Sequence, residues 1–168
     1  MIPLKKKSMK QFRFALLLLG LQIFSAQADG DVPMPARALP TYTQECAACH
    51  LAYPPGLLPA ASWKRVMGAL SSHYGVDASL DARQVQEIGT WLQTHAGTFR
   101  KATTEPPEDR ITRAAWFVRE HRKVPPEVWK LPSVKSAAQC AACHVNAGRG
   151  RFDEHELRIP AGMKGRFQ

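Results

Sequence analysis

The sequence lacks any run of β-branched residues that would form a central strand. This absence argues against a βαβ fold of the kind that carries a thioredoxin-like dithiol. Long apolar runs are few after residue 28, and the chain holds 13 prolines and 11 glycines, so it can bury only a modest core. No nucleic-acid-binding motif is present, and we therefore do not interpret the formal net charge of +9 as a sign of nucleic-acid binding.

Residues 1–28 have the three parts of a secretory signal peptide. A basic segment from Lys5 to Arg13 precedes an apolar segment at residues 14–24, and Ala26-Gln27-Ala28 fits a cleavage site. The apolar segment is shorter than the roughly 20 residues of a membrane-spanning helix, and an uncleaved anchor is the alternative. Cleavage would remove five cations and no anions, lowering the formal charge from +9 to +4. We therefore expect a periplasmic protein that is soluble after cleavage.

Cysteine is scarce, and all four cysteines lie in two copies of the pattern C-x-x-C-H, at residues 46–50 and 140–144. This pattern is the attachment site of a c-type haem. Two thiols three positions apart share one side of a helical turn, so each can bond one vinyl group of the same haem. The following histidine then serves as the proximal iron ligand. The sequence thus predicts two covalent haem c groups, on Cys46 and Cys49 with His50, and on Cys140 and Cys143 with His144.

A zinc site, a redox dithiol or structural disulfides are the alternative interpretations of these cysteines. Zinc ribbons separate their two cysteine pairs by about 15 to 20 residues, whereas Cys49 and Cys140 lie 91 positions apart. Histidine makes up only 6 of 168 residues, yet it follows both pairs directly. The coincidence favours haem attachment.

The second axial ligands decide between electron transfer and small-molecule chemistry, because an iron with two protein ligands passes electrons whereas an open position can bind a ligand. For the first haem we predict His73, which lies 23 residues after His50 and just before a glycine turn. Met67 is the competing ligand. Its place on an apolar stripe of the same predicted helix favours a role in the core.

For the second haem we predict His121, which lies 23 residues before His144. His95 is an alternative, since it lies on an apolar helix face that is compatible with either a ligand or a core residue. His155, in the polar sequence FDEHE, and Met163, in the tail, are further alternatives.

The predicted organisation is two haem-bearing halves joined by a polar linker. Residues 29–40 are expected to be a flexible lead-in, residues 41–97 the first half, residues 98–109 the linker and residues 110–168 the second half. Short helices are expected near residues 60–74, 80–96 and 112–122. A further helix is expected around each motif, introduced by capping boxes at Thr41 with Gln44 and at Ser136 with Gln139. The fold class is therefore mainly α, with short helices packed around two haems and little or no sheet.

The residues also resemble a known family, the bacterial periplasmic dihaem cytochromes c of the DHC type. The similarity covers nearly all of the chain after the signal peptide and is carried by residues 46–63, 73–81, 110–129 and 140–160. The resemblance implies bis-histidine ligation of both haems, with His73 of H-Y-G and His121 of R-E-H as the second ligands. Tyr74 replaces the phenylalanine that is usual in the family.

The resemblance further implies electron exchange with a small monohaem c-type cytochrome or a membrane b-type cytochrome. We expect a non-enzymatic carrier of single electrons. The alternative function is a small haem enzyme or a gas-binding sensor with one five-coordinate haem.

Overall fold

A computed structural model describes residues 31–163, so the predicted signal peptide lies outside the described residues. Its α-helices are α1 (Pro40–Cys46), α2 (Ala60–Gly68), α3 (Ala82–Thr94) and α4 (Ala115–Glu120), with short 3-10 turns between and after them. Over this range the β pairing is confined to isolated bridges, His73 with Val76 and His144 with Leu157. The prediction of a mainly helical fold with little or no sheet is confirmed. No helix of the described range is long and apolar enough to span a bilayer.

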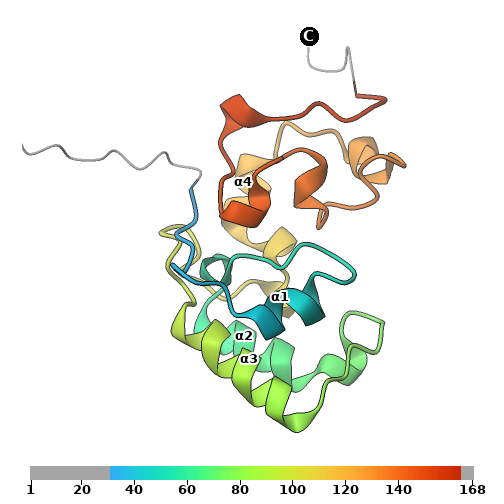
Figure 1. The fold of residues 1–168 in the computed structure, drawn as a ribbon. Helices are drawn as coiled ribbons and strands as arrows, with labels where there is room; N and C mark the ends of the chain where they lie inside the picture. Colours follow the sequence, from blue (N-terminus) through green and yellow to red (C-terminus); the bar gives the residue numbers. More distant parts are fainter. Residues whose placement is uncertain (1–30, 164–168) are drawn as a thin grey trace, which may run out of the picture.

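Helices α1, α2 and α3 pack together at one end of the molecule, and the C-terminal segments form the other end (Figure 1). Their shared core consists of buried side chains from all three helices and the loop before α2: Tyr42, Leu58, Trp63, Met67, Ile88 and Leu92. The one polar atom of the Trp63 indole is satisfied inside this core, since Nε1 donates to the Pro55 carbonyl at 2.7 Å. This core forms the platform for the first cysteine motif.

Helix α3 lies within the predicted range of residues 80–96, and local signals mark both of its ends. Asp81 caps its first turn by accepting a hydrogen bond from the Gln84 amide at 2.8 Å, and Gln84 Oε1 accepts in return from the Asp81 amide. Gly97 follows the last turn with φ of +62°, a conformation that suits glycine. Ile88 and Leu92, four positions apart, lie on its buried face.

Two predicted capping boxes are wrong. Helix α1 starts one residue earlier than predicted because Pro40 occupies its first position, where proline needs no amide partner, and Leu39 is the N-cap. It ends at Cys46, so the rest of the first motif lies in a turn rather than in a helix. Near the second motif, Ser136 caps no helix, and Cys140 opens a single 3-10 turn, Cys140–Ala142.

The predicted helix over residues 60–74 is also too long, since α2 ends at Gly68. A separate 3-10 turn, Leu70–Ser72, leads from there to His73.

The segments between the two ends of the molecule are packed. Phe99 and Ala102, within the stretch predicted as a linker, are 7% and 1% exposed. Val32 is also buried, and its amide donates to the Gly150 carbonyl at 2.8 Å. These contacts hold the two motif-bearing ends in one structure.

Candidate haem-binding sites

The first motif lies at the end of α1. Cys46 is the last helical residue and is half-buried, while Cys49 is exposed in the turn that follows. Burial raises the pKa of the Cys46 thiol to about 11, and the neighbouring Glu45 carboxylate adds to the shift. Burial likewise raises the pKa of Cys140 in the second motif to about 11. These shifts are opposite in sign to the lowered thiol pKa that is typical of a redox-active dithiol.

The structure brings the rings of His50 and His73 close together in nearly parallel planes. Their ring centroids are 6.2 Å apart and their planes differ by 24°. His73 is the residue that closes the 3-10 turn Leu70–Ser72. Burial and the proximity of His50 lower the pKa of His73, which favours the neutral imidazole with a free nitrogen lone pair.

His144 and His121 form the corresponding pair in the other half. Their ring centroids are 6.1 Å apart, and their planes are nearly perpendicular at 80°. His121 immediately follows the last residue of α4. Burial lowers the pKa of His144 to about 4, with a further contribution from His121, so this ring is also neutral at physiological pH.

The spacing of each pair fits one iron atom between two imidazoles. Metal–imidazole nitrogen bonds are about 2 Å long, which places two opposed nitrogens about 4 Å apart and the ring centroids about 6 Å apart. His50 Nδ1 lies 2.7 Å from the Leu51 carbonyl, and His121 Nδ1 lies 2.9 Å from the Phe117 carbonyl. Because a carbonyl can only accept, these Nδ1 atoms carry the proton and Nε2 is left with its lone pair for a metal.

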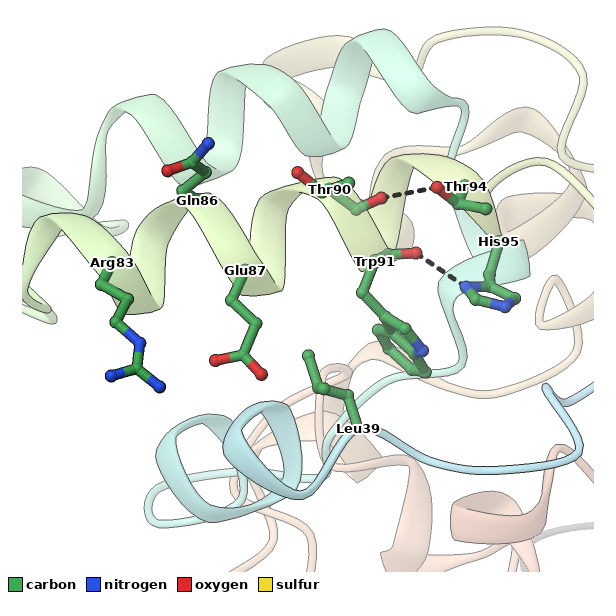
Figure 2. Close-up of a pocket in the computed structure, with 8 residues that line it drawn as sticks. All are labelled: Leu39, Arg83, Gln86, Glu87, Thr90, Trp91, Thr94 and His95. Atoms are coloured by element: carbon green, nitrogen blue, oxygen red, sulfur yellow. Dashed lines mark hydrogen bonds between the residues drawn. The ribbon is translucent and has the colours of Figure 1, made fainter.

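The alternative ligands lie elsewhere. His95 Nδ1 contacts the Trp91 carbonyl at 2.8 Å, and its ring lies beside Trp91 at the edge of a surface cavity of about 540 Å³ (Figure 2). His155 is exposed in the 3-10 turn Glu154–Glu156. Met67 and Met163 are buried in separate apolar clusters. Among the described residues, neither His95 nor His155 has its ring in contact with any of the four predicted histidine ligands.

Aromatic residues that the sequence analysis did not single out support both sites. Tyr53 stacks on His50 with ring centroids 4.8 Å apart, and its hydroxyl donates to the Ala138 carbonyl at 2.8 Å, two residues before Cys140. Phe152 meets the His144 ring edge-on at 5.4 Å. Tyr53 and Phe152 lie at different distances from the histidines of their motifs, so no repeat in the sequence marks these two aromatic residues.

The tail beyond the second motif also contributes, although it shows no periodicity. The Arg158 amide donates to the Cys143 carbonyl at 2.8 Å, next to the bridge between His144 and Leu157. The tail thereby fixes the backbone on which the second motif lies.

Two C-x-x-C-H motifs, each with a second histidine opposite its own, define a c-type cytochrome with two haem sites. The family model for dihaem cytochrome c matches residues 42–152. The chain therefore belongs to the dihaem cytochrome c family, and it carries two covalently attached haem c groups. The residues described above fit those groups.

Solved structures of dihaem cytochromes c are similar to this chain. One from Shewanella baltica OS155 is 37% identical, with a TM-score of 0.64 over 77% of this chain and 96% of that one. One from Rhodobacter sphaeroides is 38% identical, with a TM-score of 0.61 over 68% of this chain and 97% of that one. No curated protein sequence matches the chain.

Proposed function

We propose that this protein is a periplasmic carrier of single electrons whose two haems are each ligated by two histidines. His50 and His73 ligate the first iron, and His144 and His121 ligate the second. The observation that carries the proposal is the separation of the ring centroids, 6.2 Å and 6.1 Å, which is the spacing expected for one iron between two imidazoles.

This ligation favours electron transfer over an enzymatic or gas-sensing role. The bound haems supply one-electron chemistry of iron, and the protein holds the ligands and limits the access of water. If two histidines hold each haem, neither iron would offer a place for a substrate, and both potentials would lie below those of a histidine–methionine cytochrome.

The features of residues 1–28 support the proposed location, and the family resemblance supports the proposed partners. A basic segment, an apolar segment and a cleavage site in residues 1–28 direct the chain to the periplasm, where haem attachment to C-x-x-C-H is completed in bacteria. The partners are other redox proteins, either a monohaem c-type cytochrome or a membrane b-type cytochrome.

The ligand assignment is tested by replacing each second histidine in the haem-loaded protein. His73→Ala and His121→Ala should each convert one haem from low-spin to high-spin, and the reduced variants should bind carbon monoxide rapidly at that haem. The matched controls His95→Ala and His155→Ala should leave both haems low-spin. Because the imidazole planes differ by 24° in one pair and 80° in the other, electron paramagnetic resonance should distinguish which haem has opened.

Two outcomes would contradict the proposal. A low-spin spectrum that survives His121→Ala would remove His121 as a ligand. Rapid carbon monoxide binding by the unmodified protein would instead favour a five-coordinate haem and the enzyme or sensor alternative.

A further inference from the structure

The backbone beside His73 is held in an unusual conformation. The His73 carbonyl accepts from the Val76 amide at 3.1 Å, closing a tight turn whose two central residues both have positive φ, +51° at Tyr74 and +100° at Gly75. Positive φ is uncommon for a bulky residue such as tyrosine. Such a conformation persists when the surrounding structure fixes it.

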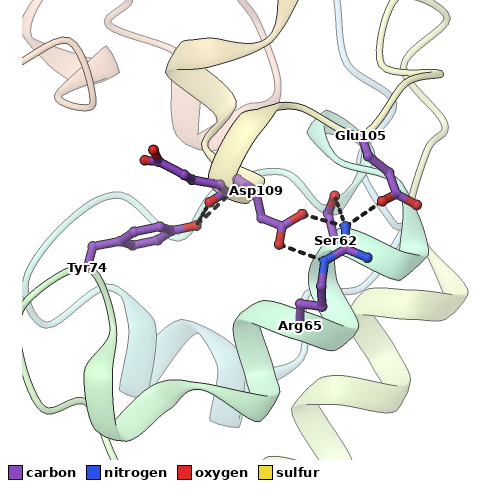
Figure 3. A network of polar contacts seen from close by, with 6 residues as sticks. Ser62, Arg65, Tyr74, Glu105 and Asp109 are labelled. Atoms are coloured by element: carbon purple, nitrogen blue, oxygen red, sulfur yellow. Dashed lines mark hydrogen bonds and ion pairs between the residues drawn. The ribbon is translucent and has the colours of Figure 1, made fainter.

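The Tyr74 side chain supplies this fixation. Its hydroxyl donates to the Asp109 carbonyl at 3.0 Å and to the Glu108 carbonyl at 3.2 Å, sharing one proton between them (Figure 3). Both acceptor residues also have positive φ, +56° at Glu108 and +53° at Asp109. The Arg110 guanidinium lies 4.2 Å from the centre of the Tyr74 ring, in a cation–π arrangement. Three unusual backbone positions thus meet at one phenol.

The acceptor segment is itself anchored to α2. Arg65 donates to both carboxylate oxygens of Asp109, at 2.8 and 2.7 Å, and to Glu105 at 2.6 Å. The Asp109 side chain is only 15% exposed, so water competes little with Arg65 for its carboxylate. The carbonyls that receive the Tyr74 hydroxyl are therefore held against the same helical unit that positions the first site (Figure 3).

We propose that the Tyr74 hydroxyl is a latch that keeps His73 on the iron of the first haem and slows its replacement by an external ligand. Tyr74 is a positioning residue, since it acts through the backbone of the adjacent His73. The inference rests on the proposed function, in which His73 is that ligand. Phenylalanine at this position would fill the same space without the hydroxyl.

Carbon monoxide is a suitable probe of the latch. For carbon monoxide to bind the reduced iron, the bond to His73 Nε2 must break, its electron pair stays with the imidazole, and a bond to carbon forms. Iron remains ferrous, so no oxidant or reductant is needed. The observed rate of carbon monoxide binding depends on the fraction of molecules in which His73 is dissociated from the iron, and the latch lowers that fraction. Loss of the hydroxyl should raise the rate about threefold to tenfold, as expected for the net effect of one hydrogen bond.

The experiment compares carbon monoxide binding by the reduced, haem-loaded protein and its Tyr74→Phe variant in stopped flow. We expect a low-spin resting spectrum in both and faster binding at the first haem in the variant. Ser133→Ala is the control, because it removes another side-chain hydroxyl that donates to a backbone carbonyl, that of Ala161 at 2.9 Å, far along the chain from the first motif. It should lower the stability of the protein without changing the rate.

A second variant, Arg110→Gln, removes the cation and keeps the hydroxyl, so its effect should be smaller. The latch is wrong if Tyr74→Phe binds carbon monoxide within twofold of the wild-type rate while His73→Ala binds it rapidly. An equal acceleration in Ser133→Ala would also overturn it. If His73→Ala instead remains low-spin, the ligand assignment under the proposed function fails, and the two failures are thereby distinguished.

Discussion

At the scale of single residues, Asp109 is a carboxylate whose charge the fold uses. Hydrogen bonds from Arg65 lower the pKa of Asp109 below its ordinary value of 3.8. A carboxyl whose pKa is lower in the folded than in the unfolded state stabilises the fold above the unfolded value, and the contribution disappears as the pH falls through the folded value.

We therefore expect Asp109→Asn to lower the free energy of unfolding at pH 7. The difference in free energy of unfolding between variant and wild type should become smaller as the pH falls below about 4. Denaturant unfolding of the haem-loaded proteins at pH 7 and pH 3 measures both effects. Glu154→Gln, which changes an exposed carboxylate in the turn Glu154–Glu156, is the control. A constant difference between the Asp109→Asn variant and the wild type at both pH values would contradict the assignment.

The residues of the two attachment motifs could be predicted from the sequence because five consecutive positions contain the whole signal. Predicting the second histidine of each site required more information than the motif contains. Spacing suggested His73 and His121, but their pairing with His50 and His144 depends on how distant segments fold. The hydrogen bonds of the Tyr53 and Tyr74 hydroxyls were not predicted, since their acceptors, the carbonyls of Ala138 and Asp109, lie 85 and 35 positions away. No local pattern encodes such contacts.

At the scale of secondary-structure elements, local sequence signals marked the ends of a helix where no second signal competed with them. Helix α3 has one cap residue, one periodic apolar face and one glycine after its end, and all three agree. In α1 two signals compete, and Pro40 fixes the start of the helix in preference to Thr41. The Thr41 hydroxyl donates to Glu87 of α3 instead.

The capping box of α3 gives a prediction for this element. Asp81→Ala should lower the free energy of unfolding by about 1 kcal/mol, because an amide of the first turn loses its acceptor. Gln86→Ala, at an exposed position within the same helix, should change it by less than about 0.5 kcal/mol. Thermal unfolding of the haem-loaded variants measures the difference, and equal effects of the two substitutions would show that the cap contributes nothing.

At the scale of the whole molecule, contacts between remote segments join the two haem sites. Tyr53 reaches from the first motif to the backbone before the second, and Val32 connects the segment before α1 to Gly150 beyond the second motif. Composition predicted a modest core, and the structure divides that core into separate apolar clusters. The Tyr53 and Val32 hydrogen bonds join the two motif-bearing ends, so single substitutions at these contacts should affect both ends.

Gly150 is such a position, and it gives the last prediction. Its φ is +74°, and an added Cβ would lie 2.3 Å from the Val32 carbonyl oxygen and 2.7 Å from the Met34 side chain. Gly150→Ala must therefore strain the backbone and displace the segment whose Val32 amide donates to Gly150. We expect a loss of about 2 to 3 kcal/mol in the free energy of unfolding, from the left-handed conformation and the weakened hydrogen bond.

The matched control is Gly68→Ala, at the last residue of α2, where an added Cβ meets nothing within 4 Å. That substitution should leave stability unchanged or raise it by up to about 1 kcal/mol, because alanine favours helix. Denaturant unfolding of the haem-loaded proteins, followed by haem absorbance and by tryptophan fluorescence, measures both variants. If Gly150→Ala matched Gly68→Ala, the segment from residue 31 to α1 would not be held against the second site. A large loss confined to Gly150→Ala would show that this segment forms part of the same cooperative unit as the second haem site.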